Sequence, residues 1–254
     1  MGSAYFDLLC REALRESRTQ GEAGIGTMQE KRLHALIKKY ICEDPDCHEV
    51  GVAGSRYVAD VRMGDAIYEV QTGSFYPMRQ KIAHYLESTS CTVTVVHPIS
   101  AVKWVSWIDP KTGEIAPRHK APRQKESELL AEMYSLLPYL SNPRLRFRLL
   151  LLETQDFRML SDRRRNRKKG SVRYERVPLS LIDEWEFNSP KDFCRFIPQD
   201  LPRHFTVSQF SSFTKIHGVD AYSSVRVLCA LGLFAEGERI GRSMGFVRRD
   251  DGLE

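Results

Sequence analysis

Residues 56–72 read RYVADVRMGDAIYEVQT, two short segments on either side of Gly64-Asp65. Apolar and polar side chains alternate in the first segment, which predicts a β-strand over 56–63. Gly64-Asp65 is a hairpin-turn signal, so the second segment, 66–72, is predicted to return as the neighbouring strand. A hairpin about this turn places Asp60 roughly opposite Glu69, with Gln71 two residues further along the same face.

Two carboxylates and a side-chain amide in this arrangement would suit a divalent cation. Carboxylate and amide oxygens are the ligands that Mg²⁺ and Mn²⁺ prefer. One or two such ions can polarise a phosphodiester and activate a water molecule. The sequence therefore predicts a metal site at Asp60 and Glu69, with Gln71 positioning water or a metal ligand. The alternative is a hairpin whose acids are solvated or paired with Arg56 and Arg62.

The predicted helix before this hairpin offers further polar groups. Glu30 lies on the side of the helix that carries Leu33 and Ile37, so it could supply a third carboxylate. The alternative is that Glu30 only completes a capping box with Thr27. His34 could approach the same site, although a histidine beside an apolar stripe is also an ordinary structural residue.

The order of the predicted elements gives an α/β fold. A helix at 27–41 precedes three strands, a helix at 75–87 and a buried β-branched strand at 91–96. The later predicted elements are strands at 103–108 and 145–153, a helix at 126–139, and a segment at 179–196 that is helical with loops.

This order, with Asp60 followed nine residues later by Glu69-Val70-Gln71, resembles the PD-(D/E)XK nuclease superfamily over about residues 26–108. The run YEVQTGSFYPMRQKIAHYL resembles its E-X-Q variant, and the whole chain resembles a group of uncharacterised bacterial proteins with a C-terminal winged helix. The resemblance implies a restriction-endonuclease-like core, a central mixed sheet flanked by helices. It also implies that Asp60 and Glu69 bind the metal, that Gln71 occupies the lysine position, and that Glu30 is the acid of the first helix.

Glutamine carries no positive charge and cannot act as a lysine does. Lys81, on the following helix, could replace the missing charge from another direction, with Arg79 as the competing candidate. The alternative for both is an ordinary solvent-facing position on the helix.

Positive charge is concentrated in one stretch. The chain has a net charge of +5, whereas residues 163–176 hold eight basic residues and one acid. Such a run predicts contact with nucleic-acid phosphates, and a solvated linker is the alternative. The expected phosphate contacts are Arg163, Arg164, Arg165, Arg167, Lys168 and Lys169.

The C-terminal residues form a separate pattern. Two short helices and a hairpin over about 204–250 are typical of a winged helix, with Arg239 and Arg242 on the hairpin as further nucleic-acid contacts. The second helix is expected to expose Tyr222, Ser223, Ser224 and Arg226 as a thin base-contacting surface. The predicted organisation is thus a nuclease-like domain with additions (1–160), a basic linker or loop (161–178), and a C-terminal region (179–254).

Composition excludes several classes of protein. The 254 residues are 42% hydrophobic and 28% charged, which is typical of a globular protein, and no apolar run is long enough to span a membrane. Six cysteines without paired spacing suggest a reducing, cytoplasmic compartment. The preferred function is an Mg²⁺- or Mn²⁺-dependent endo- or exodeoxyribonuclease, acting on DNA rather than RNA, with a homodimer left open. The alternatives are a catalytically inactive DNA-binding or regulatory module on the same core, and a protein-interaction module.

Overall fold

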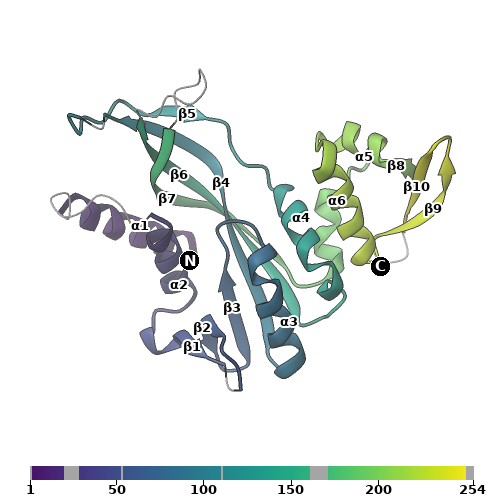
Figure 1. The fold of residues 1–254 in the computed structure, drawn as a ribbon, viewed down its shortest axis with the longest axis horizontal. Coiled ribbons are helices and arrows are strands. Elements are labelled where there is room, and N and C mark those ends of the chain that lie inside the picture. The colour runs from purple at the N-terminus through teal and green to yellow at the C-terminus, as the bar shows by residue number, and fades with distance from the viewer. Residues whose placement is uncertain (1, 20–28, 53, 110, 161–170, 250–254) are drawn as a thin grey trace.

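The computed structural model describes residues 2–19, 29–52, 54–109, 111–160 and 171–249. One large mixed sheet dominates it (Figure 1), with the strand order β1-β2-β3-β4-β6-β7 and with β5 paired to β4. The strands are β1 (His48–Gly51), β2 (Val58–Met63), β3 (Ala66–Val70), β4 (Thr92–Ile108), β5 (His119–Ala121), β6 (Leu145–Leu160) and β7 (Ser171–Phe187). The β3–β4 and β4–β6 pairs are parallel, and the remaining pairs are antiparallel.

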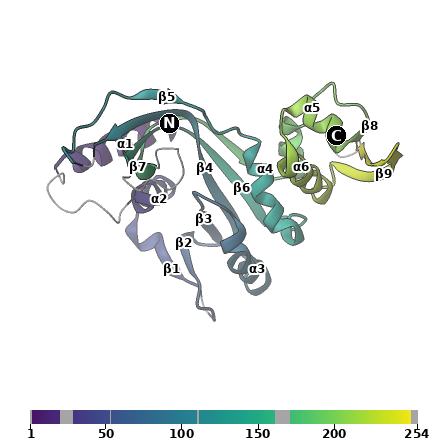
Figure 2. The ribbon, with the colours of Figure 1, turned by 45° about the horizontal axis from the view of Figure 1, so that its top comes forward.

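Helices cover both faces of this sheet, as Figures 1 and 2 show. On one face lie α1 (Gly2–Thr19) and α2 (Gln29–Ile41), and on the other lie α3 (Arg79–Ser88) and α4 (Glu128–Met133). Leu150 and Leu152 of β6 belong to the apolar cluster under α1 and α2, whereas Leu149 and Leu151 belong to the cluster on the opposite face. Successive residues of a strand point to opposite faces, so a continuous leucine run is what a strand buried on both sides requires.

The predicted order of helix, three strands, helix and strand is confirmed as α2, β1, β2, β3, α3 and β4. The hairpin at Gly64-Asp65 is also confirmed, since β2 pairs with β3 from Met63↔Ala66 to Val61↔Tyr68. The chain is therefore α/β, with a large mixed sheet between helices. Among the described residues, no helix is both long and apolar enough to cross a bilayer.

The predicted strands at 91–96 and 103–108 are parts of one strand, β4, which runs beside β6 over most of its length. The register between the two strands shifts between Ser100 and Val102. Lys103 looks like a surface residue in the sequence, but its ammonium group lies 3.2 Å from the buried carboxylate of Asp156 on β6. A pairing with a residue so distant in the sequence leaves no local signal.

The helical prediction for 179–196 is wrong up to residue 187. Strand β7 runs antiparallel to β6 through Phe187, and only the 3₁₀ helix η4 (Pro190–Phe196) follows. Cross-strand pairing overrides the local pattern, because Glu184 forms an ion pair with Arg148 on β6.

The linker interpretation of 161–178 fails for its described part. Residues 171–178 belong to β7, and the guanidinium of Arg176 makes two hydrogen bonds to Asp156, of 2.7 and 3.1 Å. The sheet thus continues across the predicted domain boundary at residue 160. Residues 161–170, with the six basic residues expected to contact phosphate, lie outside the described residues and connect β6 to β7 in the chain.

A smaller unit closes the chain. It contains β8 (His204–Thr206), α5 (Val207–Thr214), α6 (Gly218–Ala230), β9 (Phe234–Ile240) and β10 (Ser243–Arg248), with the sheet order β8-β10-β9. The expected order of helix, turn, helix and hairpin is confirmed. The Thr206–Gln209 capping box is present at the start of α5.

The face of α6 differs from the prediction. Ser223 and Ser224 are buried, and only Tyr222 and Arg226 of the four expected residues reach the surface. The reason is tertiary packing: α6 lies beside α4 (Figures 1 and 2), and Val225 and Leu228 join the same apolar cluster as Leu129 and Leu130 of α4. The smaller unit therefore shares one continuous core with the main sheet.

Candidate functional site

Asp60 lies where the β2–β3 ladder ends. The paired residues of the two strands end at Val61↔Tyr68, and just beyond them the amide N–H of Val70 donates to Asp60 Oδ2 at 2.8 Å. This hydrogen bond holds the carboxylate of β2 against the carboxyl end of β3. Residues at the end of a strand on a rigid sheet are well placed to act together.

His34 approaches the same carboxylate from α2. Its Nε2 lies 3.0 Å from Asp60 Oδ2, so the imidazole N–H donates to the carboxylate. Burial opposes ionisation of Asp60, but the hydrogen bond and charge of His34 and the Val70 amide outweigh it and hold the pKa of Asp60 below its usual value. Asp60 is therefore a carboxylate at neutral pH.

Glu69 is the buried acid of the site, with 3% of its surface exposed. Both of its partners come from α3: Lys81 Nζ lies 2.5 Å from Oε2, and the Tyr85 hydroxyl donates to Oε1 at 3.2 Å. Burial and the negative charge of Asp60 raise the pKa of Glu69 to about 7, against the opposing effect of Lys81 and Tyr85. Asp60 raises the pKa of Glu69, and Lys81 lowers the pKa of both acids, so the two acids share one electrostatic environment.

Lys81, not Arg79, supplies positive charge to the two acids. The Arg79 side chain is exposed, and its guanidinium lies over the ring of Tyr76, 5.5 Å from the centroid. The alternative pairing of the acids with Arg56 and Arg62 is not what the structure shows. Arg56 lies over the Tyr57 ring, and Arg62 donates to the Gly64 carbonyl.

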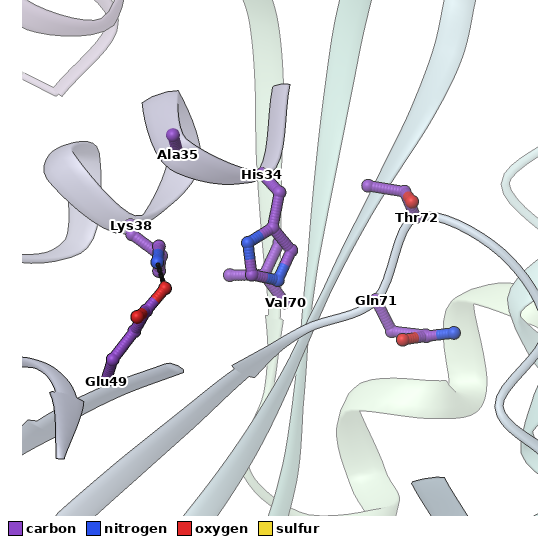
Figure 3. A pocket seen from close by; sticks show the side chains of 7 residues that line it. All are labelled: His34, Ala35, Lys38, Glu49, Val70, Gln71 and Thr72. Carbon is purple, nitrogen blue, oxygen red and sulfur yellow. Dashed lines mark hydrogen bonds and ion pairs between the residues drawn. The ribbon is translucent and has the colours of Figure 1, made fainter. Parts of the chain in front are cut away.

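Gln71 has a different environment from the one expected. Its side-chain Nε2 donates to the main-chain carbonyl of Ser74 at 2.6 Å. The main-chain carbonyl of Gln71 accepts a 2.6 Å hydrogen bond from His97 Nδ1. In Figure 3 the Gln71 side chain extends away from His34. Gln71 thus fixes the loop after β3, and its amide nitrogen is committed to that loop.

A cavity of about 560 Å³ opens beside these residues, lined by His34, Ala35, Lys38, Glu49, Val70, Gln71 and Thr72 (Figure 3). Lys38 is buried and forms a 2.8 Å ion pair with Glu49, whose backbone is left-handed (φ 52°). Such a conformation is costly for a residue other than glycine and is common at functional sites. Sequence reasoning missed Lys38 and Glu49; the only signal is that Lys38 follows His34 by one helical turn.

Some predicted site residues fall outside these contacts. Glu30 belongs to α2, but its side chain lies outside the described residues. Arg239 is exposed on β9, and Arg242 is exposed in the turn between β9 and β10. Neither arginine is part of the Asp60–Glu69 site.

Asp60 and Glu69 are the two residues of the site that could hold a divalent cation. The negative charge of Asp60 helps to raise the pKa of Glu69, and a cation bound beside the two acids would favour the carboxylate form of Glu69. In the part of the chain that the structure describes, no group of three or more His, Cys, Asp or Glu side chains is arranged to hold a metal ion. Mg²⁺ commonly binds through one or two carboxylates, with water and substrate as its other ligands.

Comparison with known proteins places this region in a family. Residues 31–188 match the family model described as "Domain of unknown function (DUF8091)", which is more than half of the chain. The chain belongs to the DUF8091 family. The DUF8091 region contains His34, Asp60, Glu69 and Lys81 and ends just after β7, before the smaller C-terminal unit. No curated protein and no solved structure matches the chain.

Proposed function

We propose that this DUF8091 protein is a nuclease that hydrolyses phosphodiester bonds in DNA with the help of Mg²⁺ or Mn²⁺. The observation that carries the proposal is the contact between Lys81 Nζ and Glu69 Oε2, at 2.5 Å, beside the ionised Asp60. Two acids and a lysine can serve metal-dependent phosphodiester hydrolysis, because the acids are ligands for the ion and the lysine places a positive charge beside them.

Each residue has a separate role in this proposal. Asp60 and Glu69 would hold the cation, which supplies Lewis acidity and lowers the pKa of its bound water. Asp60 is kept ionised by His34 and the Val70 amide. Glu69 has a pKa of about 7, so it can accept or release a proton near neutral pH. Lys81 favours the carboxylate form of Glu69 and adds positive charge where a phosphate would approach.

The family resemblance supports the same proposal. The observed order α2-β1-β2-β3-α3-β4 matches the order on which the PD-(D/E)XK resemblance rests, and Lys81 brings from α3 the charge that Gln71 lacks. We therefore propose that the main sheet forms a restriction-endonuclease-like core and that residues 204–248 form a winged-helix-like domain.

DNA is the proposed partner because of charge. The segment 163–169 contributes six basic residues, and Arg239 and Arg242 are exposed on the C-terminal hairpin. Phosphate contacts supply most non-specific affinity for nucleic acid, and they require such clusters.

The test is cleavage of labelled single-stranded, duplex and branched DNA with Mg²⁺ or Mn²⁺. The wild type is compared with Asp60→Asn and Glu69→Gln, which keep the shape of each side chain. Asp65→Asn is the matched control, because Asp65 is an exposed acid in the turn of the same hairpin. We expect Asp60→Asn and Glu69→Gln to abolish cleavage and Asp65→Asn to leave it unchanged. Cleavage that survives in both site variants would overturn the proposal.

A second function, DNA binding without cleavage, is favoured by one observation. Glu69 already has its two oxygens satisfied by Lys81 and Tyr85, so the buried acid is stabilised without any metal ion. In that case the wild type would bind DNA, would not cleave it with either metal, and would bind equally well after Asp60→Asn.

A further inference from the structure

The loop between β3 and α3 is held rigidly beside the acids. It begins directly after Glu69-Val70 and leads into the helix that carries Lys81. Gln71 fixes it through Ser74, and the amide N–H of Phe75 donates to Glu132 of α4 at 3.1 Å. The Phe75 side chain is fully buried, with its ring 5.1 Å from that of His97.

Tyr76, the next residue, points the other way. Its side chain is 67% exposed, whereas the side chains of Phe75 and Met78 on either side of it are buried. Among the aromatic residues whose side chains the structure describes, none is as exposed, and Tyr222 follows at 46%. Because Phe75 and Met78 anchor the backbone, the Tyr76 ring is presented to solvent from a fixed base.

Arg79 adds charge to this ring. Its guanidinium lies 5.5 Å from the Tyr76 ring centroid, one turn further along the chain, and both side chains are exposed. An aromatic face combined with a guanidinium is a good partner for a nucleotide, since the ring stacks on the base and the cation contacts the phosphate. Arg79 is the first residue of α3 and Lys81, which contacts Glu69, is the third, so Tyr76 and Arg79 lie at the same end of α3 as the ion pair with Glu69.

We propose that Tyr76 and Arg79 form a stacking site for an unpaired nucleobase next to the bond that is cleaved. The inference rests on the proposed nuclease function and gives it a substrate class: DNA with single-stranded nucleotides at the cleavage position. In an intact duplex every base is stacked on its neighbours, so none can lie on Tyr76 without being unpaired first. Single-stranded DNA offers bases freely, and stacking on an aromatic side chain tolerates any base.

The experiment measures binding without cleavage. The probes are single-stranded 10-mers that carry the fluorescent base 2-aminopurine at successive positions, and a duplex of the same sequence, in buffer with EDTA. We expect the wild type to quench 2-aminopurine at one or two positions. Tyr76→Leu removes the aromatic face and keeps an apolar side chain; it should weaken single-strand binding about 10-fold and abolish the quenching. Tyr76→Phe should restore both.

Two controls keep the outcomes separate. Tyr134→Leu changes another exposed tyrosine, which contacts Tyr222 instead of the loop, and should leave binding and quenching unchanged. The same measurement on Glu69→Gln, which is expected not to cleave, separates the stacking site from the nuclease proposal. Single-strand binding by Tyr76→Leu at wild-type strength, or an equal loss for single strand and duplex, would overturn the stacking site even if the protein cleaves DNA. Position-specific quenching that Tyr76→Leu abolishes would support it even if the protein proves not to cleave.

Discussion

The ammonium group of Lys81 lies 2.5 Å from Glu69 Oε2, in an ion pair that joins the first turn of α3 to the last residues of β3. The side-chain exposures are 22% for Lys81 and 4% for Glu69, so solvent reaches the lysine more than the acid. Gln71, the residue where the resemblance places a lysine, instead donates to the Ser74 carbonyl. The positive charge of the site therefore comes from tertiary packing of α3 against β3.

Replacing Lys81 by Met should shift the pH dependence of cleavage upward. Lys81 lowers the pKa of Glu69 against burial and Asp60, so its loss raises that pKa further above about 7. If the carboxylate of Glu69 is needed, the rising limb of the pH–rate profile moves to higher pH, and cleavage at pH 7 falls by roughly 100-fold.

Lys81→Arg should keep most of the pH profile, because it keeps the charge. Lys111→Met, at an exposed turn, serves as the control and should match the wild type. An unchanged profile in Lys81→Met would mean that the ion pair has no part in the reaction.

Glu69 should make the protein less stable as pH rises. Below about pH 4.5 the acid is protonated in both the folded and the unfolded chain; between 4.5 and about 7 only the folded chain keeps the proton. Folding then binds a proton, so the free energy of unfolding falls over this range, by about 3 kcal/mol in total. Glu69→Gln lacks this titration. Urea unfolding at pH 4.5 and pH 8 measures the free energy of unfolding of both proteins. The value for Glu69→Gln should increase relative to that of the wild type as pH rises. A difference that is the same at both pH values would contradict the raised pKa of Glu69.

The hairpin of the site could be predicted from sequence because its signals are local. The alternation over 56–63 and the Gly64-Asp65 turn fix the register, and Gly64 adopts the positive φ of 56° that the turn needs. The register then brings Asp60 near Glu69 without further information. Lys81 is the preferred candidate from sequence, with Arg79 competing, but its contact with Glu69 depends on how α3 packs against the sheet.

The parts that sequence reasoning missed depend on distant partners. The Arg176–Asp156 ion pair joins β7 to β6 between residues that are twenty positions apart. The basic stretch predicted to be a linker therefore continues into a strand of the main sheet. Glu49, which pairs with Lys38, has a left-handed backbone conformation. The residue types around Glu49 do not predict this conformation.

His34→Asn should weaken the site through Asp60. The imidazole donates to Asp60 Oδ2 and is among the groups that hold the pKa of that acid down. Without the imidazole, the pKa of Asp60 rises toward its usual value. The ionised acid stabilises the folded protein, so this contribution to the free energy of unfolding is lost at a higher pH in the variant than in the wild type as the pH is lowered. We expect a loss of about 1–2 kcal/mol at pH 6, measured by urea unfolding. His217→Asn, which changes a contact with Ser211 in the C-terminal unit, is the control and should show no change in the acid titration of Asp60 followed by NMR.

Asp156→Ala should destabilise the protein strongly. The Asp156 side chain is fully buried and pairs with both Lys103 and Arg176. Its removal leaves two largely buried cations without a counter-charge, which costs about 3–5 kcal/mol. Asp183→Ala, at an exposed position of β7, is the comparison and should cost far less. Thermal unfolding of both variants measures the loss of stability. A similar loss in the two variants would show that the buried Lys103–Asp156–Arg176 contacts do not hold β6 to β7.

Arg239→Gln/Arg242→Gln should weaken DNA binding through phosphate contacts alone. Both side chains are exposed at the hairpin end, and α6 is packed against α4, so the hairpin is the open part of the C-terminal unit. Each lost phosphate contact lowers the slope of log affinity against log salt by about 0.9, so the double variant should lose nearly 2. Arg11→Gln on α1, at the opposite end of the molecule in Figure 1, is the control. Titrations of labelled duplex DNA at several salt concentrations measure the slope. A weaker affinity with an unchanged slope would mean that the two arginines act by shaping the hairpin and do not touch the DNA backbone.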